Sequence, residues 1–199
     1  GAVTLSATYA GDGNFTGSSD TEPHSVSQIG STTTITNLLP ASSVVGQSVT
    51  VSVSVTATSG TPTGSVTVSD GATSCLVTLS GGIGGCNLAF PSPGARTVTA
   101  TYGGDATHTG SSSAGSGFTV GTASTTTVIG SDTPDPSVVG TAYTVGFTVS
   151  VTAPGAAVPS GNVTVSDGTG GSCTVGAGVG SCALTSTTVG AKTLTATYA

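Results

Sequence analysis

Charged side chains are scarce in this chain of 199 residues. They make up 5% of the sequence, whereas about a quarter of the residues of an ordinary soluble domain are charged. Only two residues are basic, Arg96 and Lys192, and the formal net charge is -6. A nucleic-acid-binding surface needs lysine and arginine to neutralise phosphates, so the composition excludes a nucleic-acid partner.

Methionine and tryptophan are absent, and aromatic residues amount to 4%. The apolar runs are a few residues long, whereas a bilayer-spanning helix needs about 20 apolar residues, so we expect no membrane insertion within this segment. The polarity comes instead from serine and threonine, which together form about a third of the chain. Threonine and the abundant valine are β-branched and favour pleated strands, so the composition predicts an all-β fold.

Three similar decapeptides occur along the chain. Residues 1–10 read GAVTLSATYA, residues 94–103 read GARTVTATYG, and residues 190–199 read GAKTLTATYA. Self-similarity at a spacing of about 93–98 residues is typical of a tandem array of domains. The alignment predicts three parts: 1–29 as the last strands of a preceding domain, 30–121 as a complete domain, and 122–199 as a domain that lacks its last strand.

Within each repeat, apolar residues alternate with hydroxyl-bearing ones. Val49, Val51, Val53 and Val55 are separated by serine and threonine, and the stretch 97–102 shows the same period of two. Such alternation indicates strands with one buried and one solvated face, as in the antiparallel sheets of a two-layer sandwich.

The four cysteines occupy matched positions, Cys75 and Cys86 in one repeat and Cys173 and Cys182 in the next. Four cysteines allow three connectivities, and the matched positions favour one disulfide within each repeat. Zinc is the alternative, but each repeat has two thiols and no repeated histidine. Because disulfides persist in oxidising compartments, the cysteines predict an extracellular or cell-surface location.

The spacing of the cysteines suggests how each pair is held. The members of the two pairs are eleven and nine residues apart. An odd separation allows both cysteines to face each other across a hairpin with a two-residue turn. We therefore expect tight turns near Ser80-Gly81 and Ala177-Gly178, with each disulfide joining neighbouring strands.

Several motifs together resemble the bacterial immunoglobulin-like repeat family of secreted and surface proteins. They are the STTT openings at 31–34 and 124–127, GQSVTVSVSV at 46–55, GSVTVSDG at 64–71 and TATYGGD at 99–105. The resemblance implies tandem immunoglobulin-like antiparallel β-sandwich domains arranged as a rod. It brings no catalytic residues and no cofactor, so we expect neither enzymatic activity nor a cofactor or metal site.

The aspartates that follow the repeated tyrosines have two interpretations. Asp12 and Asp105 could contribute to a calcium site at a domain junction, or accept backbone hydrogen bonds in an Asx-turn. Calcium needs six to eight oxygen ligands, and Asp132 and Asp135 have no acidic counterparts in the preceding repeat. The sequence therefore favours turns over a metal site.

The tyrosines and histidines are predicted to be structural. We expect Tyr9, Tyr102 and Tyr198 to pack at the edge of a sandwich with the hydroxyl on a backbone group. His108 aligns with Phe15, which favours a packing role over that of a metal ligand or catalytic base. His24 has no counterpart near it.

These observations predict a structural role. Only residues 121–123 separate one repeat from the next, and short connections restrict the relative orientation of neighbouring domains. We expect a stalk, fibre or filament whose partners are copies of the same repeat, head to tail, with lateral bundling through neutral faces. Covalent continuity is favoured over strand donation between molecules. The alternative is an adhesin module that binds a glycan or a host or cell-surface protein through its inter-strand loops.

Overall fold

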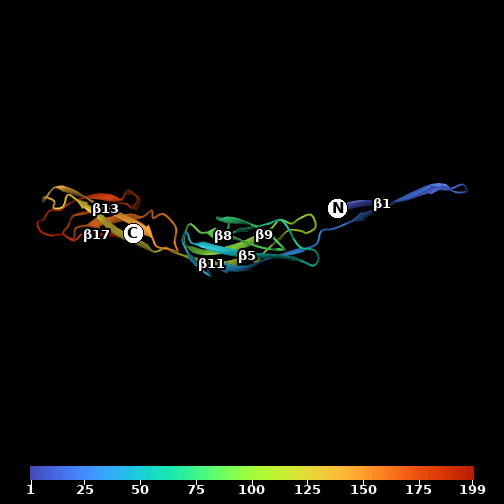
Figure 1. Ribbon diagram of the computed structural model, residues 1–199, viewed down its shortest axis with the longest axis horizontal. Coiled ribbons are helices and arrows are strands. Elements are labelled where there is room, and N and C mark those ends of the chain that lie inside the picture. Colours follow the sequence, from blue (N-terminus) through green and yellow to red (C-terminus); the bar gives the residue numbers. More distant parts are fainter. The chain divides into compact units, whose positions relative to one another are not determined.

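The computed structural model describes residues 1–199, and nearly all of its regular structure consists of strands (Figure 1). The one helical element is the three-residue 3-10 turn η1 (Ala177–Val179). No helix is long or apolar enough to cross a bilayer. The all-β fold class predicted from the alternating valines is confirmed.

The first element is a long hairpin at the blue end of the ribbon in Figure 1. Strand β1 (Ala2–Gly11) pairs antiparallel with β2 (Thr16–Ser25), and Tyr9 lies opposite Ser18. No second sheet covers the hairpin, so its alternating apolar residues Leu5 and Tyr9 are about half exposed.

Residues 31–121 form two sheets. The three-stranded sheet has the order β3-β5-β8 and consists of β3 (Ser31–Leu39), β5 (Ser48–Ala57) and β8 (Ile83–Ala89). The other sheet has the order β4-β11-β9-β6-β7, and its strands are β4 (Ser43–Val44), β11 (Ser116–Gly121), β9 (Gly94–Tyr102), β6 (Ser65–Ser69) and β7 (Ser74–Thr78). A short strand, β10 (Ser111–Ser112), pairs with β9 off this path.

The period of two in the sequence separates buried from solvated residues in these sheets. Val49, Val51, Val53 and Val55 of β5 are at most 2% exposed, whereas Thr50 and Thr56 are exposed. Burying a valine side chain stabilises the fold by about 1.5–3 kcal/mol relative to leaving it in water. The alternation is therefore sufficient to define which face of the strand is buried.

Residues 125–198 form a second pair of sheets. One has the order β12-β13-β16, with β12 (Thr125–Thr133), β13 (Ala142–Val151) and β16 (Ser181–Thr185). The other has the order β15-β14-β17, with β15 (Ser172–Gly176), β14 (Asn162–Ser166) and β17 (Thr195–Tyr198). One buried cluster draws on both sheets, namely Tyr143, Val145, Phe147, Val163, Val165, Cys182 and Leu184. This part of the chain is therefore a two-layer sandwich, which we call the C-terminal sandwich.

The hairpin β1–β2 repeats the construction of β9 and β10. Tyr102 lies opposite Ser111 in β9–β10, and Tyr9 lies opposite Ser18 in β1–β2, so the two pairs share one register. Leu5 and Tyr9 correspond to Val98 and Tyr102, which are at most 1% exposed. The same strand is thus buried in one repeat and uncovered in the other.

Candidate functional site

The cysteines lie in two disulfides, one in each of the repeats that contain them. Cys75 of β7 is bonded to Cys86 of β8 with a Cα–Cα distance of 6.1 Å, and Cys173 of β15 to Cys182 of β16 at 6.2 Å. No cysteine is free. These Cα separations lie within the range that a disulfide bridges.

The expectation that each disulfide joins neighbouring strands of one hairpin is wrong. β7 belongs to the sheet with β6, whereas β8 belongs to the sheet with β5, and β15 and β16 are divided in the same way. Ser80 and Ile83 do form a tight turn around two glycines. The chain then leaves one sheet for the other, so each disulfide joins the two sheets of its repeat.

In the second repeat, by contrast, the expected two-residue turn near Ala177-Gly178 is absent. The 3-10 turn η1 takes its place, and Gly180 closes the turn at a φ of 77°, in the left-handed region. Glycine adopts this conformation without steric cost, which explains its use between β15 and β16.

Asp12 and Asp105 accept backbone hydrogen bonds, as the Asx-turn interpretation predicts. Oδ1 of Asp12 accepts from the amides of Asn14 and Phe15, and Oδ1 of Asp105 accepts from those of Thr107 and His108. These bonds favour the ionised carboxylate. In Asp12 the hydrogen bond from Asn14 is the largest cause of a lowered pKa.

Asp105 has a further set of partners that sequence reasoning missed. Its Oδ2 accepts from both the amide and the hydroxyl of Thr63, at 2.9 and 3.1 Å. Tyr102 donates its hydroxyl to the carbonyl of Thr63 at 2.8 Å. The Thr63 amide is the largest cause of a pKa of Asp105 well below its usual range. The carboxylate thus holds two loops together, residues 58–64 and residues 103–110.

His108 is buried, as a packing residue would be, but its ring also contacts a carboxylate. It is 2% exposed, and its Nδ1 lies 2.9 Å from Oδ1 of Asp105. On the other side of the ring, Nε2 lies 3.0 Å from the carbonyl of Ser59. These two acceptors, the Ser59 carbonyl first and Asp105 second, raise the pKa of His108. The alignment with Phe15 correctly predicted a buried ring but did not indicate its polar partners or its raised pKa.

The three repeated tyrosines have different environments. Tyr102 is buried with its hydroxyl on a backbone carbonyl, as predicted. The Tyr198 hydroxyl accepts a hydrogen bond from the amide of Gly161 at 3.2 Å. Tyr9 is 46% exposed and donates to the side chain of Asp12 instead. The packing role therefore depends on the second sheet, which β1 lacks.

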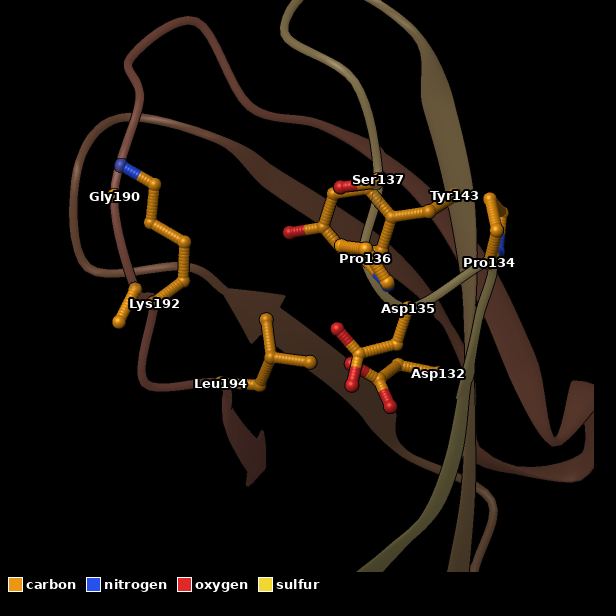
Figure 2. A pocket seen from close by; sticks show the side chains of 10 residues that line it. Asp132, Pro134, Asp135, Pro136, Ser137, Tyr143, Gly190, Lys192 and Leu194 are labelled. Atoms are coloured by element: carbon orange, nitrogen blue, oxygen red, sulfur yellow. The ribbon is translucent and has the colours of Figure 1, made fainter.

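A cavity of about 390 Å³ lies in the C-terminal sandwich beside the β12–β13 loop. In Figure 2 the side chains of Asp132 and Asp135 approach it from one side, and those of Lys192 and Leu194 from the other. Lys192 donates to the hydroxyl of Thr188. The two carboxylates are suited to accept hydrogen bonds from hydroxyl or ammonium groups. The ring of Tyr143 also borders the cavity but is 5% exposed and engaged with Ser186.

The structure brings Asp132 and Asp135 to one cavity although sequence comparison gave no reason to group them with Lys192. The sequence feature that could have pointed to these two acids is a difference between repeats, because the matching stretch NLLPAS at 37–42 has no acid. No group of three or more histidine, cysteine, aspartate or glutamate side chains is placed to hold a metal ion.

One comparison, with family models, finds a match within the first pair of sheets. The model of the bacterial Ig-like domain, group 3, matches residues 33–121. The resemblance predicted from the motifs is therefore confirmed over these residues. No match was found among curated proteins.

Two solved structures are similar at low identity. The fibronectin(III)-like modules of Clostridium thermocellum CbhA are 18% identical with a TM-score of 0.36, over 68% of this chain and 70% of that chain. The tetra-tandem repeat in the extending region of a large adhesion protein is 16% identical with a TM-score of 0.45, over 94% of this chain. The alignment covers 48% of that protein, so this chain spans about half its length.

Proposed function

We propose that this chain is a structural segment of an extracellular bacterial fibre, filament or surface-protein stalk. The observation that carries the proposal is the recurrence of one construction along the chain. The pairing of β1 with β2 repeats the register of β9 with β10, and two disulfides at matched positions join sheet to sheet. Repeated units that each contain their own core are suited to build length rather than a single site.

The proposed units are residues 1–29, 30–121 and 122–199. The exposed apolar residues of β1 support the first boundary, because Leu5 and Tyr9 correspond to the buried Val98 and Tyr102. In this division the hairpin is the last part of a preceding domain whose first strands cover its apolar face. The complete domain 30–121, expressed alone, should unfold cooperatively with its disulfide intact. Failure of this segment to fold would contradict the division.

The disulfides support a location outside the cytoplasm. Each disulfide closes a short loop and joins the two sheets of its repeat. Such bonds persist in compartments where thiols are oxidised. Labelling of intact cells with an antibody to this segment should reveal it at the surface. Protein isolated from the same cells under thiol-blocking conditions should contain no free thiol. Free thiols in that material would contradict the location.

The partners in this proposal are neighbouring copies of the same repeat. Successive domains lie head to tail in one covalent chain, and the hydroxyl-rich, weakly charged outer faces permit lateral bundling. Negative-stain microscopy of the native protein tests the proposal directly. Uniform elongated particles or bundles are expected, and compact monodisperse particles would contradict it.

The cavity beside the β12–β13 loop supports a second candidate, an adhesin that binds a glycan or a surface protein. A loop that differs between repeats and carries Asp135, with Asp132 close by at the end of β12, is the kind of feature such a function requires. Saturation-transfer NMR against glycan and peptide libraries tests it. Binding that Asp135→Asn abolishes would favour the adhesin, with Asp20→Asn in the hairpin as the matched control.

A further inference from the structure

The segment that leads from the hairpin into β3 is held by the loop that follows β9. The amide of Ile29 donates to the carbonyl of Thr107 at 2.8 Å, and the amide of Thr109 donates to the carbonyl of Ile29 at 2.9 Å. Gln28 donates its side-chain amide to the carbonyl of Asp105 at 2.7 Å, and Ser31 donates its hydroxyl to the carbonyl of Thr109. The position of residues 28–31 therefore depends on the conformation of residues 105–109.

That loop is itself organised around the ring of His108. Both ring nitrogens face oxygens that accept hydrogen bonds: Nε2 faces the Ser59 carbonyl at 3.0 Å, and Nδ1 faces the Asp105 carboxylate at 2.9 and 3.0 Å. A neutral imidazole has one N–H, whereas the imidazolium has two. Only the charged ring donates to both partners at once, and the ring itself is buried, whereas Asp105 is partly exposed.

A neutral ring must give up one of these bonds. If Nε2 keeps its proton for Ser59, the lone pair of Nδ1 faces the carboxylate of Asp105. The hydroxyl of Thr107, 3.0 Å from Nδ1, is then the remaining donor, and it already donates to Asp105. Loss of the proton therefore replaces an ionic hydrogen bond with a repulsive contact at a buried ring.

We propose that His108 and Asp105 form a proton-dependent clasp through which the 103–110 loop holds residues 28–31, the segment that leads from β2 into β3. With the ring charged, the 103–110 loop is held to Ser59 and Thr63 and in turn holds the connecting segment. With the ring neutral, the loop loosens and the connection to the preceding hairpin gains freedom. This inference goes beyond the proposed structural role, because it makes the stiffness of one junction depend on pH.

The preceding repeat contains the same turn without the clasp. Phe15 occupies the position of His108, and Asp12 still accepts the amides of Asn14 and Phe15. The backbone turn therefore needs no charged ring. His108→Phe restores the residue of the sister repeat and removes the ionic contact while keeping an aromatic ring of comparable size.

The titratable groups around the ring are few, which makes the direction of the pH effect clear. Asp105 is the carboxylate in contact with it, and Tyr102 lies next to that carboxylate with its hydroxyl on Thr63. The hydrogen bonds of the ring and of the carboxylate involve no other acid or histidine. Gly60, at a φ of 74°, leaves room for the ring, since a Cβ there would lie 3.0 Å from Nε2.

The pKa of His108 is raised in the folded protein. The stabilisation is therefore complete below the pKa of an unfolded histidine, about 6.5, and is lost as the pH rises through the folded pKa. The clasp closes in mildly acidic conditions and opens in alkaline ones.

Amide hydrogen exchange by NMR, with rates corrected for the intrinsic effect of pH, tests the clasp on the whole chain between pH 5 and pH 9. The protection of the Ile29 and Thr109 amides should fall as the pH rises, by about tenfold for each unit by which the pKa of His108 is raised. The midpoint should coincide with that of the His108 ring, followed by its 13Cε1 signal. His108→Phe should abolish the pH dependence, and His24→Gln, in the exposed hairpin, should leave it unchanged.

Several outcomes would overturn the proposal. The first is that the protection of the Ile29 and Thr109 amides does not vary with pH in the wild type. The second is that it varies in the same way in His108→Phe. The third is that the midpoint of this variation differs from the midpoint of the His108 ring titration. If the Val68 amide, in the interior of β6, lost as much protection as the Ile29 and Thr109 amides, the effect would belong to the whole domain rather than to the clasp. If His108→Phe does not fold, the wild-type protein alone still tests the proposal, because the midpoint of amide protection must coincide with the midpoint of the His108 ring titration.

Discussion

Ser186 donates its hydroxyl to Oδ2 of Asp167 at 2.6 Å, and both residues are buried. The other carboxylate oxygen accepts the amides of Thr169 and Gly171. Asp167 follows β14, and Ser186 follows β16, which belongs to the other sheet. One carboxylate therefore stabilises the β14–β15 turn and ties the two sheets of the C-terminal sandwich.

The Asp167–Ser186 bond should make this sandwich sensitive to acid. The hydrogen bond from Ser186, followed by those from the backbone, lowers the pKa of Asp167 to about 2 from an ordinary value of 3.8. A lowered pKa means that the stabilisation is present above the unfolded pKa and is lost as the pH falls through about 2. Thermal unfolding followed by the methyl signals of Val163 and Val165 should therefore show a melting temperature that drops between pH 4 and pH 2.

Asp167→Asn is the variant that isolates this effect. It should melt at a lower temperature than the wild type at pH 7, and the difference should shrink as the pH approaches 2. Glu22→Gln, in the exposed strand β2, is the control and should change neither value. A difference that stays constant with pH would show that the charge of Asp167 contributes nothing.

Each disulfide should stabilise its own domain. In the loop-entropy account, a closed loop of this length contributes about 2–3 kcal/mol to the free energy of unfolding. Cys75→Ala with Cys86→Ala should destabilise residues 30–121 by that amount, and Cys173→Ala with Cys182→Ala should do the same for residues 122–199. Denaturant unfolding with residue-specific NMR detection measures both. Loss of stability in the domain that keeps its disulfide would contradict independent units.

The two faces of β5 should respond differently to truncation. Val53→Ala removes two buried methyl groups and should cost about 2–3 kcal/mol from lost burial and the cavity left behind. Thr56→Ala on the exposed face should change the free energy of unfolding by less than about 0.5 kcal/mol. Equal effects at the two positions, measured in urea, would refute the burial pattern on which the fold rests.

The hydroxyl of Tyr102 should contribute measurably, and that of Tyr9 should not. Tyr102→Phe leaves the Thr63 carbonyl without its partner and should cost about 1 kcal/mol, as for a typical hydrogen bond. Tyr9→Phe alters a half-exposed ring whose partner Asp12 is open to water, so we expect no change. Chemical unfolding measures the free energy of unfolding of both variants. A larger loss in Tyr9→Phe than in Tyr102→Phe would contradict the prediction.

The sequence predicted the parts of this fold that depend on local periodicity. Alternation of valine with serine and threonine was enough to identify β5 and its buried face, because successive side chains of a strand point to opposite sides. The repeat of the ATY motif predicted the recurrence that the shared register of Tyr9 and Tyr102 displays. Matched cysteine positions were enough to predict pairing within each repeat.

The sequence was not enough to predict where strands leave one sheet for another. The odd spacing of Cys75 and Cys86 fits a hairpin and a sheet-to-sheet link equally well, and the structure chose the second. The raised pKa of His108 was equally hidden, because its acceptor Ser59 lies 49 residues away in the chain. The meeting of Asp135 with Lys192 at one cavity has the same origin.

The amino-acid sequence by itself determined the all-β class, the repeat and the buried face of each strand, since these follow from neighbours two residues apart and from self-similarity. Tertiary structure alone decided which sheet each strand joins and which polar groups meet inside, as at Asp105, His108 and Asp167. The physical reason is that a buried polar group must find its partners in space, and those partners come from loops that no local pattern connects.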